Sequence, residues 1–385
     1  MAITDKKTGV WGLDQTYNKI NQGSIWTYSG TNALFNWGIN THGQLGQNNT
    51  TTVSSPIQLS GTTWSQEQFN KYAGGNGTCG STKTDGTLWV WGPNGYGELG
   101  LSQPTNTHVS SPTQVPGTTW STFSMPYESS YATKTDGTLW AWGNNQYGQL
   151  GINNKTLYSS PKQVPGTTWK QGDGSWASVC VTKTDGTLYC WGKAEGMGLH
   201  AQNNNTEYSS PRQVPGTTWD TVRGGYSHMV AVKTDGTLWG WGSDGYGALG
   251  LNSNTPETSG YSSPKQVPGT TWNYISAGLF NTIATKTDGT LWAWGLNSSG
   301  ELGVNNRTQY SSPVQIPGTT WDKVGSGRYM NLATKTDGTL WAWGKPLTPD
   351  NAYYSSPTQV GSGDEWGWPN VSTYADGVRM VSRIL

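Results

Sequence analysis

Three observations predict an all-β fold in which the chain forms a single β-propeller. A segment of about 50 residues is repeated along most of the sequence. Each copy places an Asp-Gly pair between two runs of β-prone residues. No stretch shows the sustained 3.6-residue apolar period of a helix. Four short strands recurring at this period are typical of a propeller blade, so one ring-shaped domain is expected.

The repeat is clearest in the string TDGTL, which occurs six times and is followed each time by a Trp-Gly pair. Successive copies are 51, 49, 50, 53 and 49 residues apart, and a looser copy ahead of them ends in Trp37-Gly38. We expect Asp-Gly to form a two-residue type I′ turn, because both central positions of that turn need positive φ. The aspartates of the six copies are Asp85, Asp136, Asp185, Asp235, Asp288 and Asp337.

Tryptophan is expected to supply most of the core. Of the 23 Trp residues, 20 recur at equivalent blade positions, whereas Trp26, Trp176 and Trp366 fall outside them. In the strand LWAWG (291–295), Trp side chains point to one face and Leu and Ala to the other. Because blades stack face to face, large rings of one blade can pack on small residues of the next. Truncation of one such Trp to Ala should lower the free energy of unfolding by roughly 3–5 kcal/mol.

The two ends of the chain predict how the ring closes. Residues 366–385 resemble the first two strands of a unit and then stop, and residues 1–16 supply the missing third strand through Trp11-Gly12. Residues 17–365 hold seven tandem units between them. Pairing the ends would remove two exposed sheet edges. The split unit lacks the long connection found in the others, so the count stays open between seven and eight blades.

Composition limits the function classes that suit this chain. Charged residues make up only 12% of it, and 23 basic residues balance 23 acidic ones. This disfavours nucleic acid as a partner. No run of 18 apolar residues is present, so no membrane insertion is expected, and the first residues lack the apolar core of a signal peptide. A surface rich in Asn, Thr, Ser, Gln and Gly suits an extracellular or virion-surface location.

The reactive residues show no catalytic pattern. The four His residues lack metal-ligand spacing, no pair of carboxylates recurs in the variable loops, and no phosphate-binding Gly-rich loop occurs. We therefore expect no catalytic residue, no metal and no cofactor, and a protein that is not an enzyme. The Lys that precedes each TDG string is expected to be solvated beside its own Asp.

The three cysteines are expected to be small buried fillers. Cys180 and Cys190 lie in one predicted hairpin around Asp185-Gly186. A two-residue loop places Cys190 opposite Val181, so the two sulfurs would lie on different sides of the hairpin. A disulfide between them is therefore not expected, and Cys79 has no obvious partner.

The string TKTDGTLWAWG, followed by G-Q-L-G, resembles the regulator of chromosome condensation repeat, and the resemblance covers residues from about 9 to 385. It implies a propeller, usually seven-bladed, that is closed by exchange of terminal strands. It does not imply one activity, because members include a nucleotide exchange factor for a small GTPase, a plant UV-B receptor and a secreted β-lactamase inhibitor.

A second resemblance concerns the N-terminus. The string TGVWGLDQTYNKINQGSIW (8–26) is similar to segments at the ends of bacteriophage tail and virion proteins. It implies a structural virion component that acts as a decoration or as a host-receptor-binding head. The partners would be other virion proteins or a host surface receptor, either protein or glycan. The alternative is a soluble propeller that inhibits or regulates a partner protein through its variable loops.

Strand order predicts which end of the ring carries function. The first–second and third–fourth loops of every blade open at one end, where the sequence varies between units, whereas the Asp-Gly turns and PGTTW connections open at the other and barely vary. Binding residues concentrate on loops held by a rigid scaffold, and aromatic residues and Arg are favoured at hot spots. The alternative is that these loops vary because nothing constrains them. The predicted binding residues are Tyr127, Trp176, Arg223, Tyr226, His228, Phe280, Arg328 and Tyr329.

Overall fold

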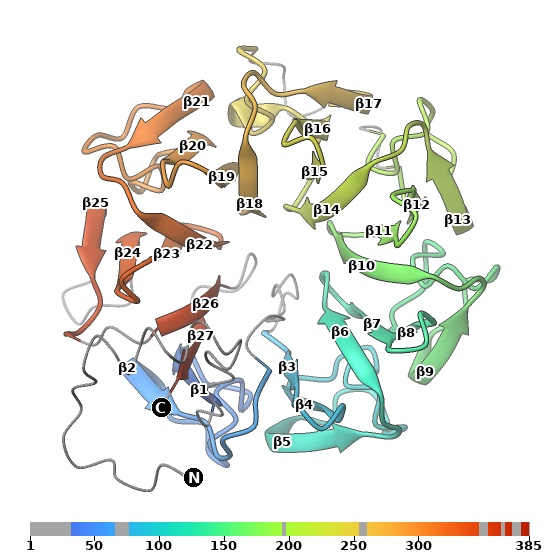
Figure 1. Cartoon of the computed structure of the whole chain (residues 1–385). Coiled ribbons are helices and arrows are strands. Elements are labelled where there is room, and N and C mark those ends of the chain that lie inside the picture. Colours follow the sequence, from blue (N-terminus) through green and yellow to red (C-terminus); the bar gives the residue numbers. More distant parts are fainter. Residues whose placement is uncertain are drawn as a thin grey trace, which may run out of the picture.

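The chain forms seven antiparallel sheets around a central axis (Figure 1). The computed structural model describes residues 32–65, 77–194, 198–253, 260–345, 353–362, 366–371 and 379–384. Within these ranges the one helical element is η1, a single 3-10 turn over Gly245–Gly247. The predicted all-β propeller is therefore confirmed, and the blade number is seven.

Each sheet is one blade. In every blade but blade 1, the described strand nearest the axis is also the earliest in the sequence (Figure 1). Blade 1 joins β26 (Trp366–Val371) and β27 (Arg379–Ile384) to β1 (Asn32–Gly38) and β2 (Val53–Gln58). Blade 2 contains β3 (Cys79–Thr82), β4 (Leu88–Gly92) and β5 (Val109–Val115). Blade 3 contains β6 (Trp120–Ser124), β7 (Ser129–Lys134), β8 (Leu139–Gly143) and β9 (Tyr158–Val164).

The remaining four blades repeat the same order from the inner to the outer strand. Blade 4 contains β10 (Trp169–Gly174), β11 (Ser178–Lys183), β12 (Leu188–Gly192) and β13 (Tyr208–Val214). Blade 5 contains β14 (Trp219–Gly224), β15 (His228–Lys233), β16 (Leu238–Ser243) and β17 (Gly260–Gln266). Blade 6 contains β18 (Trp272–Ala277), β19 (Asn281–Lys286), β20 (Leu291–Gly295) and β21 (Tyr310–Ile316). Blade 7 contains β22 (Trp321–Ser326), β23 (Met330–Lys335), β24 (Leu340–Gly344) and β25 (Tyr354–Gln359).

Blade 1 closes the ring with strands from both ends of the described chain. Strand β27 pairs with β1 from Asn32↔Ile384 to Trp37↔Arg379, so Trp37-Gly38 takes the third-strand place. Residues 1–16, which the sequence predicts as the third strand beside residues 366–385, lie outside the described residues, and β1 takes that place beside β27 instead. Trp366 opens the first strand of this blade, and its backbone N–H donates to Gly338 O at 2.9 Å. Trp366 therefore occupies the recurring Trp position at the start of a first strand, although the sequence pattern places it outside those positions.

The Asp-Gly hairpins contain three-residue loops, and the predicted type I′ turn is wrong. In blade 4, Lys183 N–H donates to Thr187 O at 2.8 Å and Gly186 N–H donates back to Lys183 O at 3.0 Å. Gly186 has φ +79, whereas Asp185 does not adopt positive φ. This is a type I turn followed by a left-handed residue. The Asp185 carboxylate accepts hydrogen bonds from the backbone and hydroxyl of Thr187, which holds it in this turn.

The extra loop residue shifts the hairpin register by one position. Cys180 now lies directly opposite Cys190, with their Cα atoms 4.1 Å apart, and the two sulfurs form a disulfide. The expectation of no disulfide is therefore wrong, because it assumed the shorter loop. Cys79 is a buried free thiol, as predicted.

Neighbouring blades are joined by the indole of the Trp-Gly pair that follows each TDGTL string. The Trp142 Nε1–H donates to Glu98 O of the preceding blade at 2.8 Å, and both residues are buried. The glycine that ends each G-x-L-G string has positive φ and lies under the same ring, where a Cβ would clash. Equivalent bonds cross five other interfaces, from Trp91 to Gln44, Trp191 to Gln149, Trp241 to Leu199, Trp294 to Ala248 and Trp343 to Glu301.

Within a blade, the recurring Lys lies over two aromatic rings. In blade 6 the Lys286 Nζ is 4.7 Å from the centre of the Trp272 ring and 4.6 Å from that of Trp292. The Trp292 Nε1–H donates to Thr290 Oγ1, whose hydroxyl donates to Asp288 Oδ1. The Lys of each TDG string is therefore half-buried and makes a cation–π contact, rather than lying solvated beside its Asp.

We predict that alanine at Gly303 destabilises the ring more than alanine at Gly361. Both glycines have φ +67, but a Cβ at Gly303 would lie 2.9 Å from Trp343 Nε1, whereas nothing lies within 4 Å at Gly361. Positive φ alone costs about 1–2 kcal/mol, and overpacking adds about 1–3 kcal/mol at Gly303. Chemical denaturation of both variants measures the difference. Equal losses would show that the indole contact does not constrain this glycine.

We also predict that the unfolded chain exposes one reactive thiol before reduction and three after it, because only Cys79 is free. Alkylation in denaturant followed by intact-mass measurement counts the modified cysteines. Modification of three cysteines without reductant would contradict the disulfide.

Candidate functional site

The variable end of the ring carries one aromatic residue on each of five successive blades. All five lie in the loop between the first and second strands, and all are half-buried. This position keeps part of each ring accessible while the blade fixes its backbone. These residues, all of them predicted from sequence, are Tyr127, Trp176, Tyr226, Phe280 and Tyr329.

Three further tyrosines reach the same end from the loop that follows the third strand. Tyr96, Tyr147 and Tyr246 each precede the first glycine of a G-x-L-G string. Tyr96 is 39% exposed, and the other two are half-buried. This loop lies at the predicted variable end, but these tyrosines are not among the predicted binding residues. Their recurrence at one position of the repeat was the signal that could have identified them.

Ring contacts join residues of neighbouring blades into groups. Trp176 packs edge-on against Tyr127 at 5.9 Å between ring centres and against Tyr147 at 5.6 Å. The ammonium of Lys193 lies 4.3 Å from the Trp176 ring centre and 4.5 Å from that of Tyr147. These contacts hold three rings and one cation together across blades 3 and 4.

A second group lies across blades 5 and 6. Phe280 packs against Tyr226 at 5.9 Å and against Tyr246 at 5.1 Å. The Trp176 N–H donates to Tyr226 O at 3.1 Å, which links the two groups through the backbone. We call the eight residues together the aromatic arc, which consists of Tyr96, Tyr127, Tyr147, Trp176, Tyr226, Tyr246, Phe280 and Tyr329.

Acidic groups lie at the start of the arc. Glu128 accepts a hydrogen bond from Asn144 Nδ2 at 2.8 Å, and its partial burial raises its pKa. Its charge in turn raises the pKa of Tyr96. Below them, Glu98 accepts hydrogen bonds from the backbone of Gly95 and Tyr96, but its burial raises the pKa of its carboxyl to about 7.

The structure places the other predicted residues differently. Arg328 lies beside the arc, with its guanidinium 4.9 Å from the ring centre of its neighbour Tyr329. His228 is buried, and its Nε2 lies 3.0 Å from Thr282 Oγ1 of the next blade. Arg223 belongs to the inner strand β14, where its guanidinium donates to Val222 O and burial lowers its pKa. Both His228 and Arg223 therefore lie apart from the variable loops.

Two searches of the described residues bear on chemistry and location. No group of three or more His, Cys, Asp or Glu side chains there could hold a metal ion. No helix in the same part of the chain is long and apolar enough to cross a membrane.

Comparison with known families identifies the repeat. The profile of the regulator of chromosome condensation (RCC1) repeat matches residues 85–123, 136–179, 235–285 and 288–333. A second profile of that repeat matches residues 220–248 and 273–301. Two curated proteins are similar over 124 residues, namely Protein RCC2 of Homo sapiens at 36% identity and the ultraviolet-B receptor UVR8 of Arabidopsis thaliana at 27%. Those 124 residues cover 31% and 32% of this chain, respectively, and it spans only about a quarter of each relative, 23% and 28%.

Solved structures share the whole ring. The crystal structure of human WBSCR16 matches with a TM-score of 0.75 at 18% identity, covering 91% of this chain and 98% of that one. The yeast RCC1 protein Prp20, solved bound to Kap60, matches with a TM-score of 0.77 at 16% identity, covering 95% and 92%. At these identities the likeness concerns the fold alone.

The expected virion role is wrong. The family profile that matches is that of the RCC1 repeat, and the similar proteins reported above come from a human, a plant and a yeast rather than from a phage. The expected virion or host-receptor partners and the virion-surface location are wrong for the same reason. The resemblance of residues 8–26 to phage proteins lies outside the described residues, and no comparison supports it.

We predict that Glu98→Gln makes folding stability less dependent on pH. A carboxyl whose folded pKa is about 7 and whose ordinary pKa is 4.5 binds more protons in the folded state. Stability is therefore highest below pH 4.5 and falls as the pH rises to about 7. Two other units carry Gln at this position, as Gln44 and Gln149. The Glu98→Gln variant should therefore have a free energy of unfolding up to about 3 kcal/mol higher than the wild type at pH 8. Urea denaturation at pH 5 and pH 8 measures this.

The reverse change serves as the control for this prediction. Gln149→Glu should introduce a loss of stability between pH 5 and pH 8, because Gln149 is buried at the same place in the next blade. Parallel pH profiles for the wild type and both variants would show that these positions do not titrate in this range.

Proposed function

Because the chain is built from RCC1 repeats, we propose that it is a protein-binding propeller that regulates or inhibits a partner protein through the aromatic arc. In this proposal the protein catalyses no reaction. The carrying observation is that the half-buried or exposed rings of the arc lie at one end of blades 2 to 7.

The composition of the arc suits a protein partner. Aromatic residues offer a large contact area, about 150–250 Å² per ring when buried, and are enriched at binding hot spots. Trp176 and Phe280 are already held by two ring contacts each, so little side-chain freedom remains to be lost on binding. Glu128, Lys193 and Arg328 are the charged side chains beside the rings. Their mixed signs favour a partner with its own paired charges over a polyanion.

The names of similar proteins support the same class of function. One solved structure of the yeast protein Prp20p describes its binding properties to Gsp1p and histones, and another shows it bound to Kap60. UVR8 is a receptor. These partners belong to those proteins, and this chain aligns with RCC2 and UVR8 over only part of their lengths. They support protein binding as the general role and leave the partner of this chain to experiment.

We predict that the double variant Trp176→Ala/Phe280→Ala loses its partner, whereas Leu157→Ala/Tyr353→Ala keeps it. Leu157 and Tyr353 are 38% and 44% exposed and lie outside the arc, so they control for a general loss of apolar surface. Truncation of a hot-spot residue costs about 2 kcal/mol or more, which is about 30-fold in affinity, so the double variant should bind about 1,000-fold more weakly.

The experiment captures partners from the natural source with the full chain, identifies them by mass spectrometry and measures their affinities with both variants. Circular dichroism and thermal melting confirm that each variant is folded. Retention of every partner by the arc variant would overturn the proposed function of the arc. Equal loss in both variants would also count against it.

A further inference from the structure

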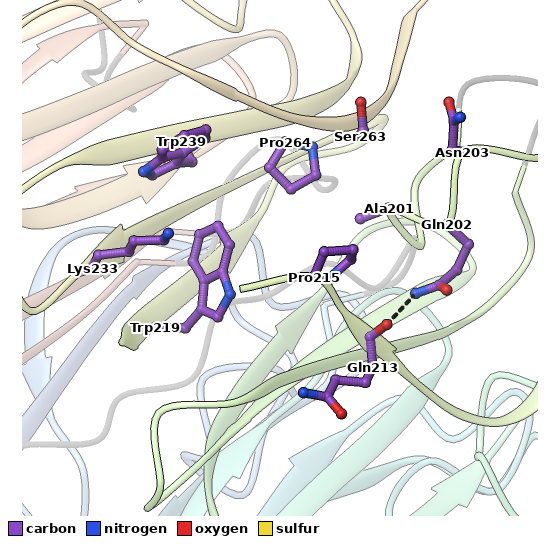
Figure 2. A pocket seen from close by; sticks show the side chains of 10 residues that line it. All are labelled: Ala201, Gln202, Asn203, Gln213, Pro215, Trp219, Lys233, Trp239, Ser263 and Pro264. Atoms are coloured by element: carbon purple, nitrogen blue, oxygen red, sulfur yellow. Dashed lines mark hydrogen bonds between the residues drawn. The ribbon is translucent and has the colours of Figure 1, made fainter. Parts of the chain in front are cut away.

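A pocket of about 320 Å³ lies between blades 4 and 5, at the end opposite the aromatic arc. Trp219, Lys233 and Trp239 of blade 5 form one side, and Gln202 and Pro215 come from the chain leaving blade 4 (Figure 2). Pro264, from the outer strand β17, covers the space beside Trp219 (Figure 2). The pocket thus combines aromatic and proline faces with one cation. Among the described residues that line it, none is acidic.

Two hydrogen-bond donors in this pocket meet no acceptor. Trp219 is 2% exposed, and its Nε1, like that of the equivalent Trp in the other blades, is buried without a hydrogen-bond partner. Figure 2 shows this nitrogen on the side of the ring that faces Pro215. The Lys233 Nζ contacts the Trp219 and Trp239 rings at 4.5 and 4.8 Å from their centres. Both nitrogens lie within 3.7 Å of the place that a Cβ on Gly216 would occupy, so they flank one small space.

The negative charge nearest to Lys233 in sequence is engaged elsewhere. The Asp235 carboxylate accepts hydrogen bonds from the backbone N–H and the hydroxyl of Thr237. An unpaired buried N–H and a half-buried ammonium both favour an anionic acceptor. The surrounding rings favour an apolar group attached to that anion.

The wall of the pocket lacks an apolar side chain that most units carry. At the place of Gln202, four other connections carry aliphatic residues that pack against the Trp cluster of the next blade, and the connection of blade 1 carries Gln47. Gln202 instead turns back and donates to Gln213 O at 3.2 Å (Figure 2). The space that an aliphatic chain would fill is therefore left open at this interface. The aliphatic residues are Leu101, Ile152, Leu251 and Val304.

We propose that this pocket is a second binding site, separate from the arc, for a carboxylate joined to a short apolar group. The Lys233 ammonium and the Trp219 indole N–H receive the carboxylate, and Trp239 and Pro264 pack against the apolar group. A small organic acid and the C-terminus of a peptide ending in an apolar residue share this chemistry. No part of the inference depends on the arc, so the two proposals stand or fall separately.

The test uses the full chain and four probes in isothermal titration and ligand-observed NMR. The probes are 3-phenylpropionate, its neutral amide, and an acetylated Gly-Phe dipeptide with a free or an amidated C-terminus. The expected result is saturable binding of a carboxylate, with the matching amide at least about tenfold weaker. Tighter binding of the dipeptide than of 3-phenylpropionate assigns the site to peptide C-termini, and the reverse assigns it to small acids. Either order supports the site.

Three variants locate the binding. Gln202→Leu, which introduces the aliphatic residue found at four other interfaces, should abolish saturable binding while the protein stays folded. Lys233→Met should weaken binding about tenfold, whereas Lys286→Met, the same change at the interface filled by Leu251, should leave it within about twofold. The proposal is overturned if neither carboxylate binds saturably, if the amides bind equally well, or if Gln202→Leu binds like the wild type.

Discussion

The hydrogen bond from the Trp of each Trp-Gly pair to a carbonyl of the preceding blade is the interaction on which the ring depends. The strands hydrogen bond only within their own sheet, so neighbouring blades meet through side chains and through backbone bonds of their loops. The Trp294 Nε1–H, bonded to Ala248 O at 2.9 Å, adds a directional contact to this packing. Gly250 lies under the same ring, which explains why the connection ends in glycine. The bond also pairs the buried indole N–H, which would otherwise cost free energy, whereas the N–H of a first-strand Trp such as Trp219 has no such partner.

This constraint divides the molecule into two unlike ends. At one end, Asp288, Thr290 and Lys286 form a closed set of contacts around two Trp rings, and the same set recurs in the other units. Little can vary there without loss of packing. At the other end, the loops lie outside the packing that holds each blade, so residues such as Trp176 and Phe280 can vary without loss of ring stability. The aromatic arc is a product of that freedom.

The most informative residues are those that depart from the repeat. Glu98 and Glu301 take the place of Gln, and burial raises the pKa of both carboxyls to about 7. Gln202 takes the place of an aliphatic residue and leaves a pocket beside Trp219. In a tandem repeat the other copies show what packing alone requires at each position. A departure with a physical consequence therefore stands out without any comparison to other proteins.

The sequence by itself determined the all-β class, the propeller, its period and the end of the ring that varies, because each follows from local patterns repeated many times. It could not settle the blade number or the disulfide, because both depend on pairings distant in sequence or on a one-residue change of register. Cys180 meets Cys190 only through the three-residue loop at Asp185-Gly186. His228 looked like a loop residue but faces Thr282 of the next blade, a contact that no pattern within one unit encodes. Only the tertiary structure decided which aromatic residues meet, because contacts between blades join residues about 50 positions apart.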